Sequence, residues 1–175
     1  MNLGAAKRLR KELLNLERPS TKTNRNDQDE DVIYLRPSSA SSILRWTAKI
    51  RGPPDTPFAG GIYGLSIVCG SDYPLSPPTI KFDTSMSVGT INCTDKIFHP
   101  NIHFQSGEIC LDILRREWSP AWSLQSACRA VVALLSDPDA SSPLNCDAGN
   151  MIRADDMLAY EGVAALYNEE GRNQP

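Results

Sequence analysis

The sequence of 175 residues contains neither a long apolar segment nor an excess of basic charge. The longest strongly apolar run, from Ala130 to Leu135, is far shorter than the ~20 residues that a helix needs to span a bilayer. The net charge of −3 disfavours binding to nucleic acid or to an acidic membrane through the molecule as a whole. The first residues mix basic side chains with leucines and contain no signal-peptide core. We therefore expect a soluble intracellular protein.

Paired cysteines are absent as well. None of the five cysteines lies in a C-x-x-C motif: Cys69, Cys93, Cys110, Cys128 and Cys146. An odd number of cysteines without paired spacing is typical of free thiols in a reducing compartment and disfavours a disulfide framework. The length predicts one domain, residues 1–175, which can bury a core without disulfides or a structural metal.

Hydrophobic periodicity predicts an α+β fold. Leu9, Leu13 and Leu16 recur at helical spacing within the basic first 18 residues. Four strand candidates follow, and their short connections are typical of an antiparallel meander: Val32–Leu35, Ile43–Arg51, Ile62–Cys69 and Thr79–Phe82. The helical period returns after Ser123, a candidate N-cap, and the last helical region is divided near Asp155. Strands followed by helices are the order of a segregated α+β domain.

The segment between sheet and helices, residues 83–121, has little regular periodicity. Loops of this length are usually functional or disordered, and the many apolar residues of this one argue against disorder. Because it carries Cys110 and both histidines of the chain, we expect the chemistry of the protein there.

Three kinds of chemistry compete for this loop. A zinc site would use four residues whose intervals match no usual ligand pattern: Cys93, His99, His103 and Cys110. A hydrolase would pair Cys110 with a histidine, but both histidines lie close upstream, whereas such enzymes bring the base from a distant part of the chain. A cysteine that only passes an acyl group between thioesters needs exposure and oxyanion stabilisation rather than a strong base. An isolated cysteine is otherwise most often buried and inert.

Several motifs occur in one order along the chain. They are GPPDTPFAGG at residues 52–61, YPLSPP at 73–78, HPN at 99–101, GEICLDIL at 107–114 and WSPA at 118–121. Together they closely resemble the ubiquitin-conjugating enzyme family, and the resemblance extends from the first helix to the last. It implies the fold of that family: an amino-terminal helix, a four-stranded antiparallel meander sheet, a long active-site loop and carboxy-terminal helices.

The resemblance also implies roles for residues of the loop. Cys110 corresponds to the cysteine that accepts the carboxy-terminal glycine of ubiquitin as a thioester. Asn101 corresponds to the asparagine whose amide steadies the oxyanion, or the loop beside it, during transfer. His99 and Pro100 would shape that loop, and Asp112 lies where relatives contact the ubiquitin tail.

Further positions match surfaces of the family. Ser142 occupies the gate near the cysteine, where many relatives carry Asp and so have a carboxylate that helps to deprotonate a lysine. The loops that relatives use to bind RING-type ligases carry Leu75, Ser119, Pro120 and Ala121. The first-helix patch that meets the activating enzyme is Lys7, Arg8 and Lys11. No metal or cofactor is implied, because ATP is used by the upstream activating enzyme.

The chain departs from the common family pattern at three places. The segment 83–98, which carries Cys93, is longer than in compact members. One more residue separates Asn101 from Cys110 than is usual, which would shift the oxyanion donor. Trp122 stands where common relatives have a smaller aliphatic residue, next to the helix that usually holds the apolar patch of ubiquitin.

Within the family, the chain looks like the peroxisomal branch, the fungal peroxin enzymes. The features that carry this resemblance are EWSPAWSL at residues 117–124, DMLAYEGV at 156–163 and the extra residue before Cys110. The peroxin enzymes act at the cytosolic face of the peroxisome and attach a single ubiquitin, often to a cysteine, of cycling matrix-import receptors. The resemblance implies five partners: ubiquitin, the activating enzyme, a RING-type ligase, an import receptor and a peroxisomal membrane-anchor protein. The anchor would recruit the chain from the cytosol, because the chain has no membrane span and does not end in Ser-Lys-Leu.

Two alternatives to this function remain. One is a general cytosolic, lysine-directed ubiquitin-conjugating enzyme. The other is a non-catalytic binding module on the same fold, which the presence of Cys110 together with Asn101 disfavours.

Overall fold

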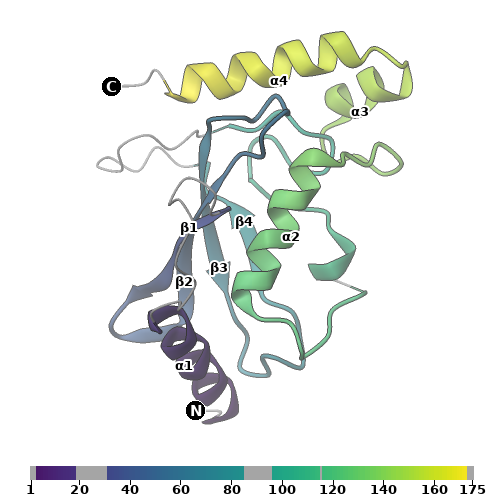
Figure 1. Ribbon diagram of the computed structural model, residues 1–175. Helices are drawn as coiled ribbons and strands as arrows, with labels where there is room; N and C mark the ends of the chain where they lie inside the picture. The colour runs from purple at the N-terminus through teal and green to yellow at the C-terminus, as the bar shows by residue number, and fades with distance from the viewer. Residues whose placement is uncertain (1–2, 19–30, 85–95, 115, 173–175) are drawn as a thin grey trace.

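The computed structural model describes residues 3–18, 31–84, 96–114 and 116–172. Its elements in chain order are α1 (Leu3–Glu17), β1 (Val32–Ser39), β2 (Ser42–Arg51), β3 (Ile62–Val68), β4 (Thr79–Phe82), the 3-10 helix η2 (Asp112–Leu114), α2 (Leu124–Ser136), α3 (Cys146–Arg153) and α4 (Met157–Arg172). The predicted order of helix, strands, long loop and helices is therefore confirmed (Figure 1).

The four strands form one antiparallel sheet in the order β1-β2-β3-β4, which confirms the predicted meander. Alternate residues of β2, including Trp46, Ala48 and Ile50, are fully buried, as a strand with one face on the core requires. The edge strand β1 continues to Ser39, beyond its predicted end. It contains Pro37, and an edge strand tolerates proline because the missing N–H need not pair with a further strand.

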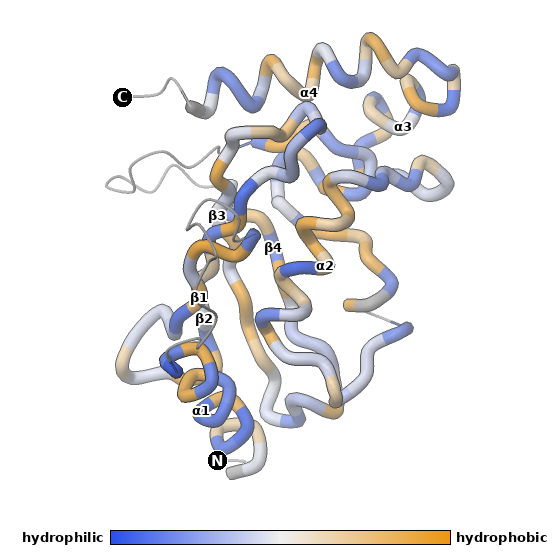
Figure 2. Tube along the Cα trace, in the orientation of Figure 1, coloured by the Kyte–Doolittle hydropathy of each residue, from blue (hydrophilic) through white to orange (hydrophobic). Residues whose placement is uncertain are grey.

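Helices cover the sheet and extend past its ends. The helix α2 packs against β1 and β2, and α1 packs against β2. In Figure 1, α1 lies at one end of the molecule and α3 and α4 lie at the other. Figure 2 shows hydrophobic residues along the strands and α2, whereas α1 and α4 alternate between hydrophobic and hydrophilic residues, as amphipathic surface helices do.

Local signals set the helix boundaries as predicted. The Ser123 hydroxyl accepts a hydrogen bond from the Ser126 backbone N–H, and the Ser123 N–H donates to the Ser126 Oγ at 2.8 Å, which forms a capping box. Asp155 adopts a left-handed conformation with φ of 59° between α3 and α4. A residue in this conformation ends a helix, and the predicted division near Asp155 is thus confirmed.

Aromatic rings connect the helix α4 to the middle of the long loop. Phe98 stacks on Tyr167 with ring centroids 6.1 Å apart, and Phe104 meets the same tyrosine edge-on at 5.1 Å. The Asn168 side chain donates to the carbonyl oxygens of Pro57 and Ala59, which lie in the 52–61 motif. These contacts hold the loop and the motif against one helix. In the part of the chain that the structure describes, no helix has an apolar stretch sufficient to cross a bilayer.

Candidate functional site

Cys110 lies at the end of a short backbone hairpin. Its N–H donates to the Asn101 carbonyl oxygen at 2.8 Å, and the His103 N–H donates to the Glu108 carbonyl oxygen at 2.8 Å. Gly107 closes the turn with a φ of 67°, and a Cβ there would lie 2.1 Å from the Phe82 carbonyl oxygen. Only glycine fits such a left-handed position against a neighbouring strand. The hairpin therefore pairs the backbones of Asn101 and Cys110 with each other.

The cysteines differ in their accessibility. Cys110 is partly exposed and Cys146, the first residue of α3, is exposed. Cys69 and Cys128 lie in the core, and burial raises the pKa of each thiol to about 12, so neither forms a thiolate near neutral pH. Cys93 lies outside the described residues. Cys110 is thus a reachable thiol on an ordered backbone.

The Asn101 side chain is held by two reciprocal hydrogen bonds. Its Nδ2 donates to the Asp139 carbonyl oxygen at 2.8 Å, and its Oδ1 accepts from the Asp139 N–H at 2.8 Å. These bonds orient the buried amide and fasten the hairpin to the loop after α2. An amide nitrogen carries two donors, and the bond to Asp139 uses one of them.

His99 and Pro100 connect the hairpin to the interior. The fully buried His99 ring accepts from the Asn101 N–H at its Nδ1 and donates from its Nε2 to the Leu134 carbonyl oxygen at 3.0 Å. Burial lowers the pKa of His99 to about 4, so the ring is neutral at pH 7. The Pro100 carbonyl oxygen accepts from the N–H groups of Leu144 and Asn145.

These contacts leave His99 no role as the base of a cysteine hydrolase, because both ring nitrogens are engaged in the interior. His103 lies in the hairpin turn, where its Nδ1 accepts from the Ser106 N–H. Among the described residues, no group of His, Cys, Asp and Glu side chains is arranged to hold a metal ion. The zinc hypothesis also required Cys93, which lies outside those residues.

Asp112 and Ser142 are both exposed. Asp112 begins η2, two residues after Cys110. Ser142 follows Asp139 on the loop after α2, where the Asp139 carboxylate accepts from the Ser141 N–H at 2.7 Å. This bond lowers the pKa of Asp139, so its carboxylate remains ionised at neutral pH.

Known proteins are similar to this chain in sequence and in fold. The sequence profile of the family described as "Ubiquitin-conjugating enzyme" matches residues 8–167. "Ubiquitin-conjugating enzyme E2 pex4" of Dictyostelium discoideum is 50% identical over 146 residues, which cover 83% of this chain and 90% of that protein. "Protein PEROXIN-4" of Arabidopsis thaliana is 48% identical over 127 residues, which cover 73% of this chain and 74% of that protein.

A solved structure is similar over almost the whole chain. It is the crystal structure of the H. polymorpha ubiquitin-conjugating enzyme Pex4p in complex with the soluble domain of Pex22p. The TM-score is 0.85 at 39% sequence identity, and the match covers 94% of this chain and 96% of that one. The chain belongs to the ubiquitin-conjugating enzyme family. The names of these relatives also confirm the resemblance to the peroxisomal branch.

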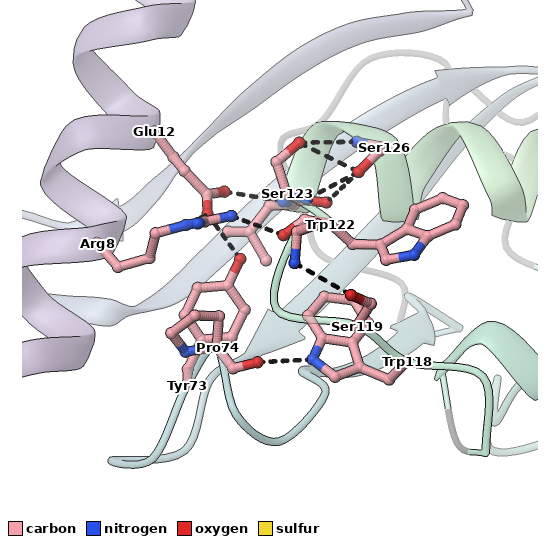
Figure 3. A network of polar contacts seen from close by, with 11 residues as sticks. Arg8, Glu12, Tyr73, Pro74, Trp118, Ser119, Trp122, Ser123 and Ser126 are labelled. Atoms are coloured by element: carbon pink, nitrogen blue, oxygen red, sulfur yellow. Dashed lines mark hydrogen bonds and ion pairs between the residues drawn. The ribbon is translucent and has the colours of Figure 1, made fainter.

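The structure of this ubiquitin-conjugating enzyme brings the two expected ligase loops together. The Trp118 indole N–H donates to the Pro74 carbonyl oxygen at 2.8 Å, which joins loops that are far apart in the sequence (Figure 3). Leu75 is 78% exposed beside this contact. Of the expected ligase contacts on the second loop, Pro120 and Ala121 are exposed and Ser119 is half-buried.

The three basic residues expected on the first-helix patch differ in environment. Lys7 and Lys11 are exposed, whereas Arg8 is half-buried. The Arg8 Nε forms an ion pair with the Glu12 Oε1 at 2.6 Å, and its Nη2 donates to the Trp122 carbonyl oxygen at 2.7 Å. The hydrogen bond to the Glu12 carboxylate raises the pKa of Arg8. Glu12 was not expected as an organising residue, although its i, i+4 spacing from Arg8 is the spacing of a helical ion pair.

We predict that His99 resists protonation down to acidic pH. Its pKa is about 4 in the folded protein and 6.5 in an ordinary environment, so its contribution to stability is complete above pH 6.5 and is lost as the pH falls toward 4. Between pH 7 and pH 5 this one group should lower the free energy of unfolding by about 2 kcal/mol. NMR titration should show a His99 ring signal with its midpoint near pH 4, assigned by its disappearance in His99→Gln. A midpoint near 6.5 would contradict the buried, neutral assignment.

Proposed function

We propose that this enzyme accepts ubiquitin as a thioester on Cys110 and transfers it, with a RING-type ligase, as a single ubiquitin to import receptors of peroxisomal matrix proteins for their recycling. The observation that carries the proposal is the hairpin that pairs the backbone of the partly exposed Cys110 with that of Asn101, whose side-chain amide is oriented by Asp139. The two buried cysteines offer no comparable thiol.

The chemistry requires two exchanges at one sulfur. In the first, the Cys110 thiolate attacks the carbonyl carbon of the ubiquitin terminal glycine, and the thiolate of the activating enzyme leaves. In the second, an acceptor amine or thiol attacks the new thioester, loses its proton, and releases the Cys110 thiolate. Each exchange passes through an oxyanion, to which the second amide N–H of Asn101 would donate. The amide needs little reorganisation, because Asp139 already holds it.

The remaining site residues are proposed to act around this sulfur. Asp112 follows Cys110 in the position expected to contact the ubiquitin tail, and Lys7 and Lys11 present exposed positive charge to the activating enzyme. Leu75, Pro120 and Ala121 are exposed and would contact the ligase. The reaction on this chain uses no metal or cofactor, since the activating enzyme consumes the ATP.

The peroxisomal assignment is supported by the relatives. Proteins up to 50% identical carry the names pex4 and PEROXIN-4, and the H. polymorpha Pex4p was crystallised with the soluble domain of Pex22p. We infer that a membrane-anchored protein of the Pex22p kind recruits this chain to the cytosolic face of the peroxisome.

The first prediction concerns the thioester. With ubiquitin, activating enzyme and ATP, the chain should form an adduct that a thiol reductant removes, detected on non-reducing gels. Cys110→Ser should give a reductant-resistant ester or no adduct, because an oxygen ester is not cleaved by thiols. Cys146→Ser, which alters the other accessible cysteine, should retain the reductant-sensitive adduct. A thioester that persisted in Cys110→Ser would exclude the assignment.

The second prediction concerns the acceptor. Ser142 supplies no carboxylate to take a proton from lysine, whereas a cysteine thiol loses its proton near neutral pH far more readily. Ser142→Asp should therefore raise the rate of discharge to free lysine relative to discharge to free cysteine, measured on the preformed thioester. Ser141→Asp, which places the same charge one residue away, should change this ratio less. An unchanged ratio in Ser142→Asp would remove the proposed link between Ser142 and thiol acceptors.

The third prediction concerns location. In fractionated cells the chain should sediment with peroxisomes, and alkaline carbonate should release it, because it would be held by a protein partner. Mild protease treatment of purified peroxisomes should abolish rebinding of the chain. Recovery only in the cytosolic fraction would favour a general cytosolic, lysine-directed enzyme instead.

A further inference from the structure

One buried carboxylate connects three parts of the chain. Glu12 of α1 is only 7% exposed. Its Oε1 accepts from the Arg8 Nε at 2.6 Å and from the Tyr73 hydroxyl at 2.7 Å, and its Oε2 accepts from the Leu124 N–H at 2.8 Å (Figure 3). A positive side chain and the amino-terminal end of α2 both contact this carboxylate. Burial, with Glu12 beside it, raises the pKa of Tyr73, so its hydroxyl keeps the proton that it donates.

Tyr73 belongs to the first ligase-facing loop, residues 71–76. Its hydroxyl is tied to Glu12, and its ring lies 6.1 Å from the Trp118 ring, centroid to centroid. The Leu75 N–H donates to the Asp72 carbonyl oxygen at 2.8 Å, so the exposed Leu75 side chain projects from a closed turn. The position of this turn depends on the buried tyrosine beside it.

The second ligase-facing loop, residues 118–122, rests on the same carboxylate. Arg8, paired with Glu12, donates to the Trp122 carbonyl oxygen, and the Trp122 N–H donates to the Ser119 carbonyl oxygen at 2.9 Å. Trp118 donates in turn to Pro74 of the first loop. The two loops are therefore bound to each other and to the helix α1. Glu12 itself is buried, so it would not contact the ligase directly.

The Cys110 hairpin has a different set of supports. It is held by Phe82 of β4 at Gly107, by the Asp139 backbone at Asn101, and by His99 at the Leu134 carbonyl oxygen. The contacts that place the thiol and the contacts that place the ligase loops thus involve different residues.

We propose that Glu12 and Tyr73 are positioning residues for ligase recognition, which hold both ligase-facing loops in the binding geometry through hydrogen bonds to the Glu12 carboxylate. A preorganised surface binds more tightly, because less flexibility is lost on association. Weakening the network should then raise the ligase concentration needed for discharge and leave the chemistry at Cys110 unchanged. This inference rests on the proposed function, in which these loops bind a RING-type ligase.

The test uses Tyr73→Phe in the full chain, which removes the hydroxyl and keeps the ring against Trp118. The probe is a RING-domain fragment selected beforehand because it accelerates discharge of the wild-type thioester. We expect the activating enzyme to load Tyr73→Phe at the wild-type rate. The KM for the RING fragment should rise about three- to tenfold, which corresponds to the loss of one hydrogen bond to a charged group. At saturating RING fragment the discharge rate should equal that of the wild type. Glu12→Gln should shift KM in the same direction.

The matched control is Ile67→Val, which removes one methyl group from the fully buried core face of β3. It lowers stability by an amount similar to the loss of one hydrogen bond, but leaves the network intact, so its KM for the RING fragment should remain that of the wild type. Hydrogen exchange supplies a readout that needs no ligase. In Tyr73→Phe the amides of Leu75, Trp122 and Leu124 should lose protection, whereas the Cys110 and His103 amides should keep it.

The measurements distinguish failure of the positioning role from failure of the proposed function. If Tyr73→Phe and Glu12→Gln give the same KM and the same amide protection as Ile67→Val, the positioning role is wrong even though the wild type loads and discharges. If the wild type forms no thioester on Cys110, the proposed function is wrong instead. In that case the hydrogen-exchange comparison still shows whether the carboxylate holds the two loops.

Discussion

The site depends on one backbone pairing, in which the Cys110 N–H donates to the Asn101 carbonyl oxygen. This pairing fixes the spacing of the two backbone segments that carry the Cys110 thiol and the Asn101 amide. Its strands are too short to be stable alone, since isolated hairpins are marginal in water. The surrounding contacts supply the stability: Gly107 packs on β4, and the buried His99 binds the end of α2.

The loop after α2 contributes to this site through its backbone. Asp139 binds Asn101 with its N–H and carbonyl groups, and its carboxylate is engaged with the Ser141 N–H. Ser142, which follows, carries no charge. The contacts that this loop makes with Asn101 are therefore between neutral backbone and amide groups, whereas the Asp139 carboxylate is bound to Ser141.

A second polar centre lies away from the thiol. The Glu12 carboxylate would be costly to bury alone, and three donors from α1, the 71–76 loop and α2 offset that cost. Because all three donors bind the same carboxylate, the three elements are coupled through a single group. The contacts that support Cys110 and Asn101 are thus separate from those that support the loops 71–76 and 118–122.

The sequence by itself determined the elements and the family. Alternation in β2, the Ser123 cap and the break at Asp155 depend on residues a few positions apart, and such local relations are visible as patterns. The motifs around Cys110 and Asn101 likewise identified the family and marked these two residues as the candidate site before any contact was known. No local pattern marks an edge strand, so the continuation of β1 through Pro37 was missed.

Only the tertiary structure decided which basic side chains are exposed and which form contacts inside the molecule. Lys7, Arg8 and Lys11 form one basic cluster in the sequence, but the fold turns Arg8 inward to Glu12 and Trp122. It also brought Tyr73 and Leu124 to one carboxylate and Asp139 to Asn101, pairs separated by 38 residues or more. Bonds of this kind depend on how the helices and the sheet pack together, and the spacing of residues along the chain carries no record of them.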